Sequence, residues 1–186
     1  MQERGKAMKP LSARKGILIC GAYGLGNAGD EAILTAILSQ VRAAVPEAEI
    51  TVLSRSPHET AEQYQVRALY MFDFPGIWRV LRDTRLYING GGSLIQDATS
   101  RRSLLYYLYT LYAAKRRNCR VLMYGCGVGP VTRKGDIRFT RHVLNHSVDA
   151  ITLRESDSLR ELEAMRVNRP EIILSADPAL TLRSAP

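Results

Sequence analysis

The sequence predicts an α/β fold in which a doubly wound parallel sheet carries helices on both faces. Short apolar runs alternate with longer segments of helical periodicity along nearly the whole chain. The runs are apolar at consecutive positions, which is typical of strands buried on both faces. Glycine-rich segments follow three of them, at the strand ends where such folds bind their ligands.

The first half of the chain begins with a compact apolar strand at 16–20. The segment 30–44 carries an apolar stripe at helical spacing and stops shortly before Pro46, which indicates a helix. The remaining elements expected in this half are a strand at 49–53, a weak helix at 58–65, a short strand at 66–70 and a helix at 75–82 that opens with proline.

The second half repeats this alternation. A strand at 86–88 runs directly into Asn89 and three glycines, and a long helix at 102–117 is rich in leucine and tyrosine. We interpret the tyrosine stripe of that helix as core or interface packing; its members are Tyr106, Tyr107, Tyr109 and Tyr112. The other expected elements are strands at 120–124, 149–153 and 171–174 and helices at 135–146 and 155–165.

The composition indicates a globular chain without a nucleic-acid or metal site. It is 46% hydrophobic and 24% charged, and no apolar run reaches the ~18 residues that a membrane span needs. Three cysteines without CxxC spacing and three scattered histidines predict reduced, buried thiols and no metal site. His142 and His146, four residues apart on an expected helix, are expected to form a surface pair, with a two-ligand metal site as the alternative. The net charge of +8 is spread along the chain, which favours an acidic partner domain or an anionic membrane surface over nucleic acid.

The domain organisation follows from the same patterns. Residues 1–15 are polar and basic without the apolar stretch of a secretory signal, so we expect a flexible leader. Residues 16–182 form the α/β domain, and the chain ends six residues after a strand-end loop at 175–180, so we expect a second, C-terminal domain to be absent from it. The expected location is the cytoplasm, with peripheral contact to the inner face of the membrane and self-association as further expectations.

The first glycine-rich segment, 21–31, is a candidate anion loop that contains Gly26, Asn27 and Asp30. Glycines let backbone N–H groups approach an anion, and the N-terminus of the following helix adds partial positive charge. A tight turn that needs glycine for conformation alone is the alternative. Asp30 and Glu31 would repel a pyrophosphate and are interpreted as helix-capping residues.

The same segment matches the dinucleotide fingerprint GxGxxG at residues 24–29. The second half of that fingerprint fails, because the strand at 49–53 leads into Arg55 instead of an acidic residue. An NADP-binding hypothesis therefore depends on contact between Arg55 and a 2′-phosphate. No GK[ST] follows, which excludes a P-loop.

Two further glycine-rich segments and one arginine complete the candidate site. The second segment runs from Asn89 to Ser93, contains Gly90, Gly91 and Gly92, and is followed by Gln96. Gly127 lies in the third segment, 125–130. Together they predict a glycine-lined cleft suited to a sugar or phosphate, with Gln96 and Asp97 either binding hydroxyls or facing solvent. Arg154 directly follows a strand and can grip a carboxylate or phosphate through two hydrogen bonds; an ion pair with Glu155 or Asp157 is the alternative.

These motifs in series resemble the polysaccharide pyruvyl transferase family, in particular its CsaB type. The matching segments are GxxGxGNxGDE, YINGGGSLIQD, YGCGVGP, LRESDS and ADPAL, in that order between residues 16 and 182. The resemblance implies a GT-B-like N-terminal domain that faces a second α/β domain across a cleft.

The resemblance also implies an activity. Members of the family move the enolpyruvyl group of phosphoenolpyruvate onto a sugar hydroxyl pair as a pyruvate ketal, without a cofactor. CsaB-type enzymes use N-acetylmannosamine in cell-wall polymers that anchor surface-layer proteins, so the partners implied are phosphoenolpyruvate and a glycan or lipid-linked glycan. Arg154 would hold phosphoenolpyruvate, with Asn27, Asp30 and Gly90–Gly92 lining the cleft.

Part of the catalytic machinery is expected outside this chain. Protonation of phosphoenolpyruvate needs a general acid, and no residue of the chain stands out, so the acid is expected from the second domain. The family's histidine and lysine or arginine from that domain have no counterpart here, and the chain alone is expected to be inactive. A nucleotide-sugar-dependent GT-B glycosyltransferase and a non-enzymatic oligomerisation unit are the competing hypotheses.

Overall fold

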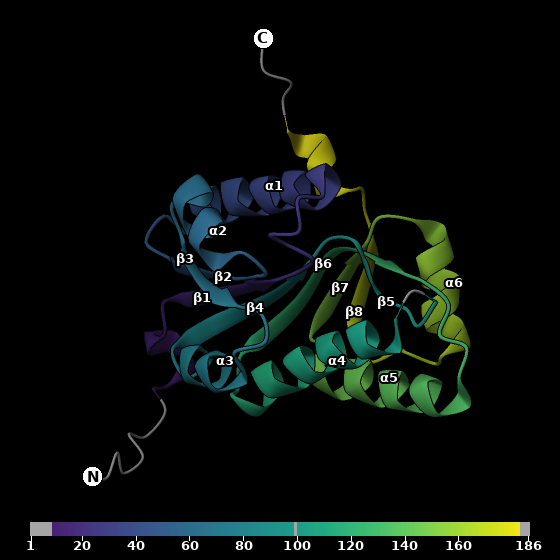
Figure 1. Ribbon diagram of the computed structural model, residues 1–186. Coiled ribbons are helices and arrows are strands. Elements are labelled where there is room, and N and C mark those ends of the chain that lie inside the picture. The colour runs from purple at the N-terminus through teal and green to yellow at the C-terminus, as the bar shows by residue number, and fades with distance from the viewer. Residues whose placement is uncertain (1–8, 99, 183–186) are drawn as a thin grey trace.

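The computed structural model describes residues 9–98 and 100–182, and it has the predicted doubly wound α/β architecture (Figure 1). The sheet order is β3-β2-β1-β4-β6-β7-β8, with β5 paired to the end of β6, and every pairing is parallel. The strands are β1 (Gly16–Cys20), β2 (Glu49–Ser54), β3 (Arg67–Tyr70), β4 (Thr84–Gly90), β5 (Ser93–Ile95), β6 (Arg120–Val128), β7 (Ala150–Leu153) and β8 (Glu171–Leu174).

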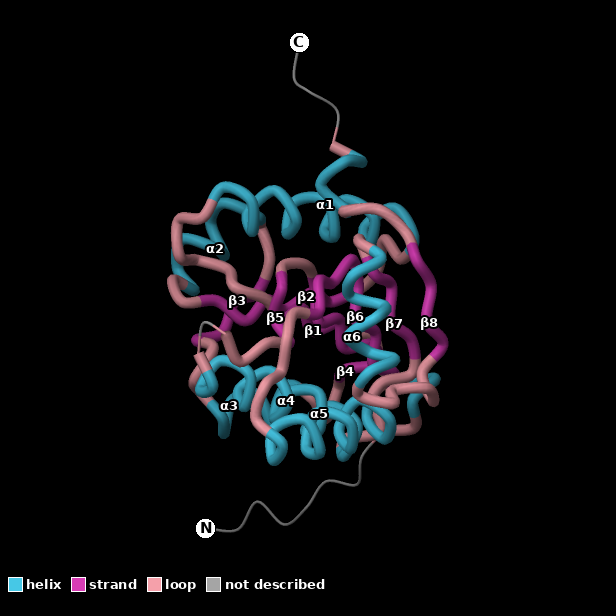
Figure 2. Tube along the Cα trace, turned by 90° about the vertical axis from the view of Figure 1, so that its right-hand side faces the viewer, coloured by secondary structure: helices cyan, strands magenta, loops and turns pink. Residues whose placement is uncertain are grey.

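The helices cover both faces of this sheet. One face carries α1 and α2, and α3, α4 and α5 lie on the other, as Figures 1 and 2 show from two directions. Their bounds are α1 (Ala28–Ala44), α2 (Pro57–Tyr64), α3 (Phe74–Val80), α4 (Arg101–Arg116), α5 (Lys134–Ser147) and α6 (Ser156–Ala164), and short 3-10 helices span Leu11–Ala13 and Pro178–Thr181.

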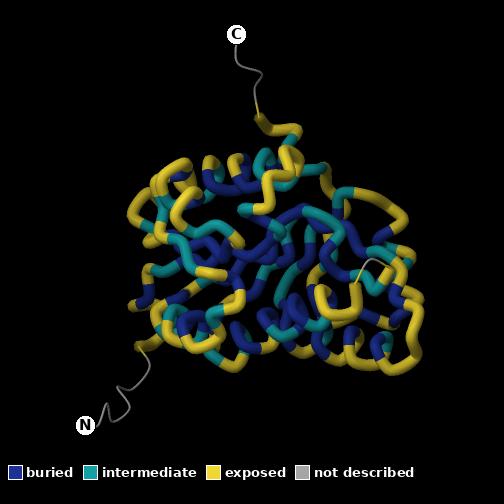
Figure 3. The backbone as a smooth tube through the Cα atoms, viewed as in Figure 1, coloured by how far each residue is buried: buried dark blue, intermediate teal, exposed yellow. Residues whose placement is uncertain are grey.

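Two apolar cores, one on each face, hold the layers together (Figure 3). Alternate residues of β1 point to opposite cores: Leu18 packs with α4, and Ile19 packs with α1. Every expected helix and strand is present. Tyr106 and Tyr107 are buried in the α4 core as the sequence indicated, whereas Tyr112 is 44% exposed.

The sheet order places a topological switch point between β1 and β4. The chain winds from β1 outward to β2 and β3, and then returns to β4 and winds in the opposite direction. Loops at the carboxyl ends of these two strands part to opposite faces, which leaves a crevice where open α/β sheets bind ligands.

Three elements differ from the sequence-based expectation. The segment 125–130 was expected to be a strand-end loop, but β6 continues to Val128 because β5, which was not expected, pairs with it at Ser93 and Gly127. The carboxyl end of the expected leader also packs against the domain. Arg14 is buried, and its guanidinium donates to the carbonyls of Thr84 and Arg117. Residues 1–8 of that leader lie outside the described residues.

The cysteines and histidines follow the sequence analysis. Cys20, Cys119 and Cys126 are free and buried, and burial raises the pKa of the Cys126 thiol to about 12. His142 and His146 stack on the exposed side of α5. Within the described part of the chain, no group of side chains is arranged to hold a metal ion, and no helix is long and apolar enough to cross a membrane.

Candidate functional site

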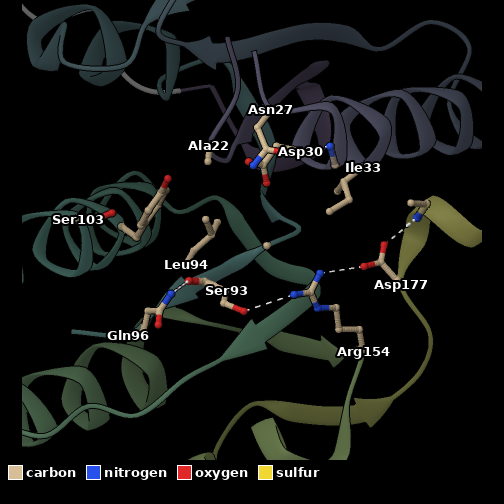
Figure 4. Close-up of a pocket in the computed structure, with 14 residues that line it drawn as sticks. Ala22, Asn27, Asp30, Ile33, Ser93, Leu94, Gln96, Ser103, Arg154 and Asp177 are labelled. Carbon is tan, nitrogen blue, oxygen red and sulfur yellow. Dashed lines mark hydrogen bonds and ion pairs between the residues drawn. The ribbon is translucent and has the colours of Figure 1, made fainter. Parts of the chain in front are cut away.

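A cleft of about 550 Å³ opens at the switch point (Figure 4). Its walls come from the loop after β1, the start of α1, β5 and its flanks, α4, and the residues after β7 and β8. The side chains and backbone that line it belong to Ala22, Asn27, Gly29, Asp30, Ile33, Gly92, Ser93, Leu94, Gln96, Ser103, Tyr107, Arg154, Asp177 and Ala179.

The loop after β1 is built as a tight turn that ends at the helix cap. Gly24 and Gly26 have φ values of +73° and +74°, and Gly24 donates its backbone N–H to Glu31 Oε1 at 2.8 Å. Asn27 is the N-cap of α1 and accepts from the backbone N–H of Gly29 at 3.0 Å. The expectation that Asp30 and Glu31 cap the helix is therefore corrected: Asn27 caps it, and Glu31 holds the turn.

Arg154 reaches into the cleft from the end of β7. One guanidinium nitrogen donates to Asp177 Oδ2 at 2.9 Å and another donates to Ser93 Oγ at 3.4 Å, and 26% of the side chain is exposed. The ion-pair partner is Asp177, and not Glu155 or Asp157 as the alternative supposed; Asp157 pairs with Arg160. Arg154 is thus a cation with exposed donor capacity at the mouth of the crevice.

We expect Asp177→Asn to strengthen anion binding at Arg154. The carboxylate competes with an incoming anion, and the asparagine oxygen can still accept from Ala179 N, as Asp177 Oδ1 does at 2.9 Å. Loss of a partly screened pair is worth on the order of 1 kcal/mol, so the Kd for inorganic phosphate should fall about three- to tenfold in a calorimetric titration. Weaker binding in the variant would show that Asp177 positions Arg154 and does not compete with the ligand.

Asp30 is the second charged group of interest in the cleft. It lies in the first turn of α1 and is half-buried. Burial raises the pKa of its carboxyl group, the charge of Glu31 adds to the rise, and Arg154 opposes it. Figure 4 shows Asp30 and Arg154 approaching the cleft from different elements.

The structure brings together five of the nine residues that the sequence singled out, namely Arg154, Asn27, Asp30, Gly92 and Gln96. The other four lie outside the lining. Gly90 and Gly91 pack under α1, Gly127 contacts Ser93 and Glu155, and Gly26 faces open space. Asp97 also points elsewhere and accepts from the backbone N–H groups of Thr132 and Arg133.

Ser93, which belongs to the second predicted loop, lines the cleft as well. Sequence reasoning assigned no site role to three further residues of the lining: Ser103, Tyr107 and Asp177. Asp177 lies in the loop after β8, and its position at a strand end was the available signal. Ser103 and Tyr107 come from the first turns of α4, which the sequence pattern does not place near β1. Arg55 donates to Tyr70 Oη at 3.1 Å and is not part of the lining, so the NADP hypothesis finds no support in this cleft.

Comparisons with known proteins agree with this architecture. A family model described as polysaccharide pyruvyl transferase matches residues 27–186. No curated protein matches the chain. Among solved structures, the crystal structure of Anabaena Alr3699/HepE in complex with UDP and glucose is similar, with a TM-score of 0.54 and 8% identity.

That structural match covers 88% of this chain and 44% of the other, so this chain spans about half the length of the protein it resembles. At 8% identity the likeness shows the fold alone, and it supports the GT-B-like α/β fold expected from the sequence.

Proposed function

This chain belongs to the polysaccharide pyruvyl transferase family, and we propose from that membership that it forms the donor-binding half of an enzyme that uses phosphoenolpyruvate. The single observation that carries the proposal is Arg154, a partly exposed cation in the cleft at the switch point. Phosphoenolpyruvate has a carboxylate and a phosphate, and a planar guanidinium binds either through two hydrogen bonds.

The surroundings of Arg154 suit this donor. Gly29 and Gly92 line the same cleft, so backbone can approach a phosphate closely, and the N-terminus of α1 contributes partial positive charge. Among the described residues that line the cleft, none is a cysteine or histidine that could serve as a nucleophile. The transfer we propose needs none, because the acceptor's own hydroxyl groups form the new bonds.

The complete catalytic unit, in this proposal, includes a second α/β domain. The match to less than half of the HepE chain supports it. The finer assignments follow the resemblance to the CsaB type: N-acetylmannosamine in a glycan or lipid-linked glycan as acceptor, a role in surface-layer anchoring, and a cytoplasmic location near the membrane.

A glycosyltransferase activity is the second candidate, because the similar solved structure holds UDP and glucose. The two donors differ in the groups that the cleft would have to bind. A uridine diphosphate sugar brings a pyrophosphate and a base, whereas phosphoenolpyruvate brings two anionic groups on three carbons.

Phosphate release from phosphoenolpyruvate by the complete enzyme tests the proposal. We expect release that depends on a glycan containing N-acetylmannosamine, with a pyruvate ketal detected on the glycan by mass spectrometry. Absence of release with such glycans, together with tight binding of a uridine diphosphate sugar, would move the protein to the glycosyltransferases.

A further inference from the structure

We propose that the Asp30 carboxyl group is the acid that protonates the methylene carbon of phosphoenolpyruvate. This inference rests on the proposed donor and assigns a role that the sequence left to the second domain. It begins from a position: Asp30 lines the same cleft as Arg154, which would hold the donor's anionic groups. A proton donor for the methylene carbon has to lie within reach of a donor held there.

The other ionisable side chains of the lining either have partners within the protein or do not release a proton readily. Asp177 pairs with Arg154 and accepts from the backbone of Ala179. Tyr107 is buried, and burial raises the pKa of its phenol, so it holds its proton firmly. The carboxyl group of Asp30 forms no hydrogen bond or ion pair with any residue that the structure describes. It is a half-buried carboxyl group that faces the cleft and is left for a ligand.

Glu31, its neighbour on α1, shows the contrast. Glu31 accepts from Gly24 N at 2.8 Å and from Tyr64 Oη at 2.7 Å, so both of its oxygens hold the fold together. Asp30 and Glu31 therefore have different roles, although they are neighbours in the sequence. One is structural, and the other faces the cleft.

The electrostatics favour the acidic form of Asp30 when the donor is bound. Burial raises the pKa of Asp30, the nearby charge of Glu31 raises it further, and Arg154 is the cation that lowers it. Asp177 faces the cleft as a second negative charge. A bound carboxylate or phosphate would neutralise Arg154 and add negative charge, so the pKa of Asp30 rises again on binding. The donor thus promotes protonation of the acid that it needs.

The step conserves atoms and charge. The Asp30 proton forms a C–H bond with the electron pair of the donor's carbon–carbon double bond, which leaves positive charge on the carbon that carries the phosphate. One acceptor hydroxyl oxygen bonds to that carbon and returns its proton to Asp30. The carbon–oxygen bond to phosphate then breaks with its electron pair, and the second hydroxyl closes the ketal as its proton passes to the departing phosphate.

The test compares Asp30→Asn and Asp30→Glu in the complete enzyme. Asparagine keeps the size of the side chain but carries no acidic proton, so kcat should fall about 10²- to 10⁴-fold. The Kd for phosphoenolpyruvate, measured calorimetrically, should stay within about threefold or tighten, because a negative charge beside Arg154 is removed. Glutamate should restore part of kcat. Glu59→Gln removes a carboxylate from the first turn of α2, on the exposed surface, and should leave kcat unchanged.

The pH profile separates proton transfer from a structural role. A group that acts as an acid is lost as the pH rises through its pKa, so kcat of the unaltered enzyme should fall on the alkaline side, and the residual activity of Asp30→Asn should lack that fall. A wild-type kcat in Asp30→Asn, or a loss confined to phosphoenolpyruvate affinity, would overturn the assignment while the proposed function stands. Failure of the unaltered enzyme to release phosphate with an acceptor would instead remove the proposed function.

Discussion

Arg154→Ala is expected to lower kcat/KM for phosphoenolpyruvate by at least about 100-fold in the complete enzyme. Arg154 is the cation of the cleft lining, and it presents its guanidinium at the end of β7 between Asp177 and Ser93. Truncation removes both hydrogen bonds that the guanidinium could give to an anionic donor and leaves Asp177 as a bare negative charge beside it. A loss on the order of 3 kcal/mol corresponds to about this factor.

Two companion variants make the result specific. Arg154→Lys keeps the positive charge but loses the planar guanidinium, so its kcat/KM should lie between those of Arg154→Ala and the unaltered enzyme. Arg160→Ala removes an exposed arginine from α6, where it pairs with Asp157 at 3.3 Å, and should leave kcat/KM unchanged. Steady-state phosphate release over a range of donor concentrations measures all three. Equal kinetics in Arg154→Ala and the unaltered enzyme would remove Arg154 from the donor site.

The layers of the fold could be predicted from the sequence because local patterns determine them. The consecutive apolar residues of 16–20 and the helical stripe of 30–44 carry their structure in their own spacing. Strand β5 was missed because three residues between a glycine pair and a helix have no periodicity to detect. β5 forms through its pairing with β6, which is a contact between segments far apart in the sequence. The same pairing makes Gly127 part of a strand where a loop was expected.

The residues of the candidate site that lie in or beside strand-end loops could be predicted from the sequence. The side chains that reach the site from a helix on the face of the sheet could not. Arg154 directly follows β7, and Asn27 closes the loop that leads from β1 to α1, so the parallel topology brings them to one edge. Four of the glycines predicted to line the cleft lie outside it. A glycine at a strand end can be needed for close packing as well as for the approach of a ligand, and the sequence does not distinguish the two. Tyr107 entered from α4, and its contribution depends on the packing of that helix against β1, which the sequence pattern does not contain.

Gly91→Ala is expected to lower the thermal midpoint of unfolding by on the order of 10 °C, and to impair donor use as a consequence. Gly91 has a φ of +70°, which costs a residue with a side chain roughly 1–2 kcal/mol. An added Cβ would also lie 2.1 Å from Cγ2 of Ile33, which is buried on α1, and overpacking of this kind costs about 1–3 kcal/mol. Together these penalties remove a large part of a domain's usual stability.

The position of the clash determines the functional effect and the control. Ile33 is one α-helical turn from Asp30 and lines the cleft with it, so displacing Ile33 moves the wall that carries the proposed acid. Gly135→Ala, on α5 with no atom near the added Cβ, should keep or slightly raise the midpoint because alanine favours helix. Ile33→Ala alone should also lower the midpoint, because it leaves a cavity in the core. Combined with Gly91→Ala it removes the overlapping methyl groups, so in calorimetry the two changes together should lower the midpoint by less than the sum of their separate effects. An unchanged midpoint in Gly91→Ala alone would mean that the loop after β4 yields without disturbing α1, and that the close packing of these two elements does not hold the cleft in shape.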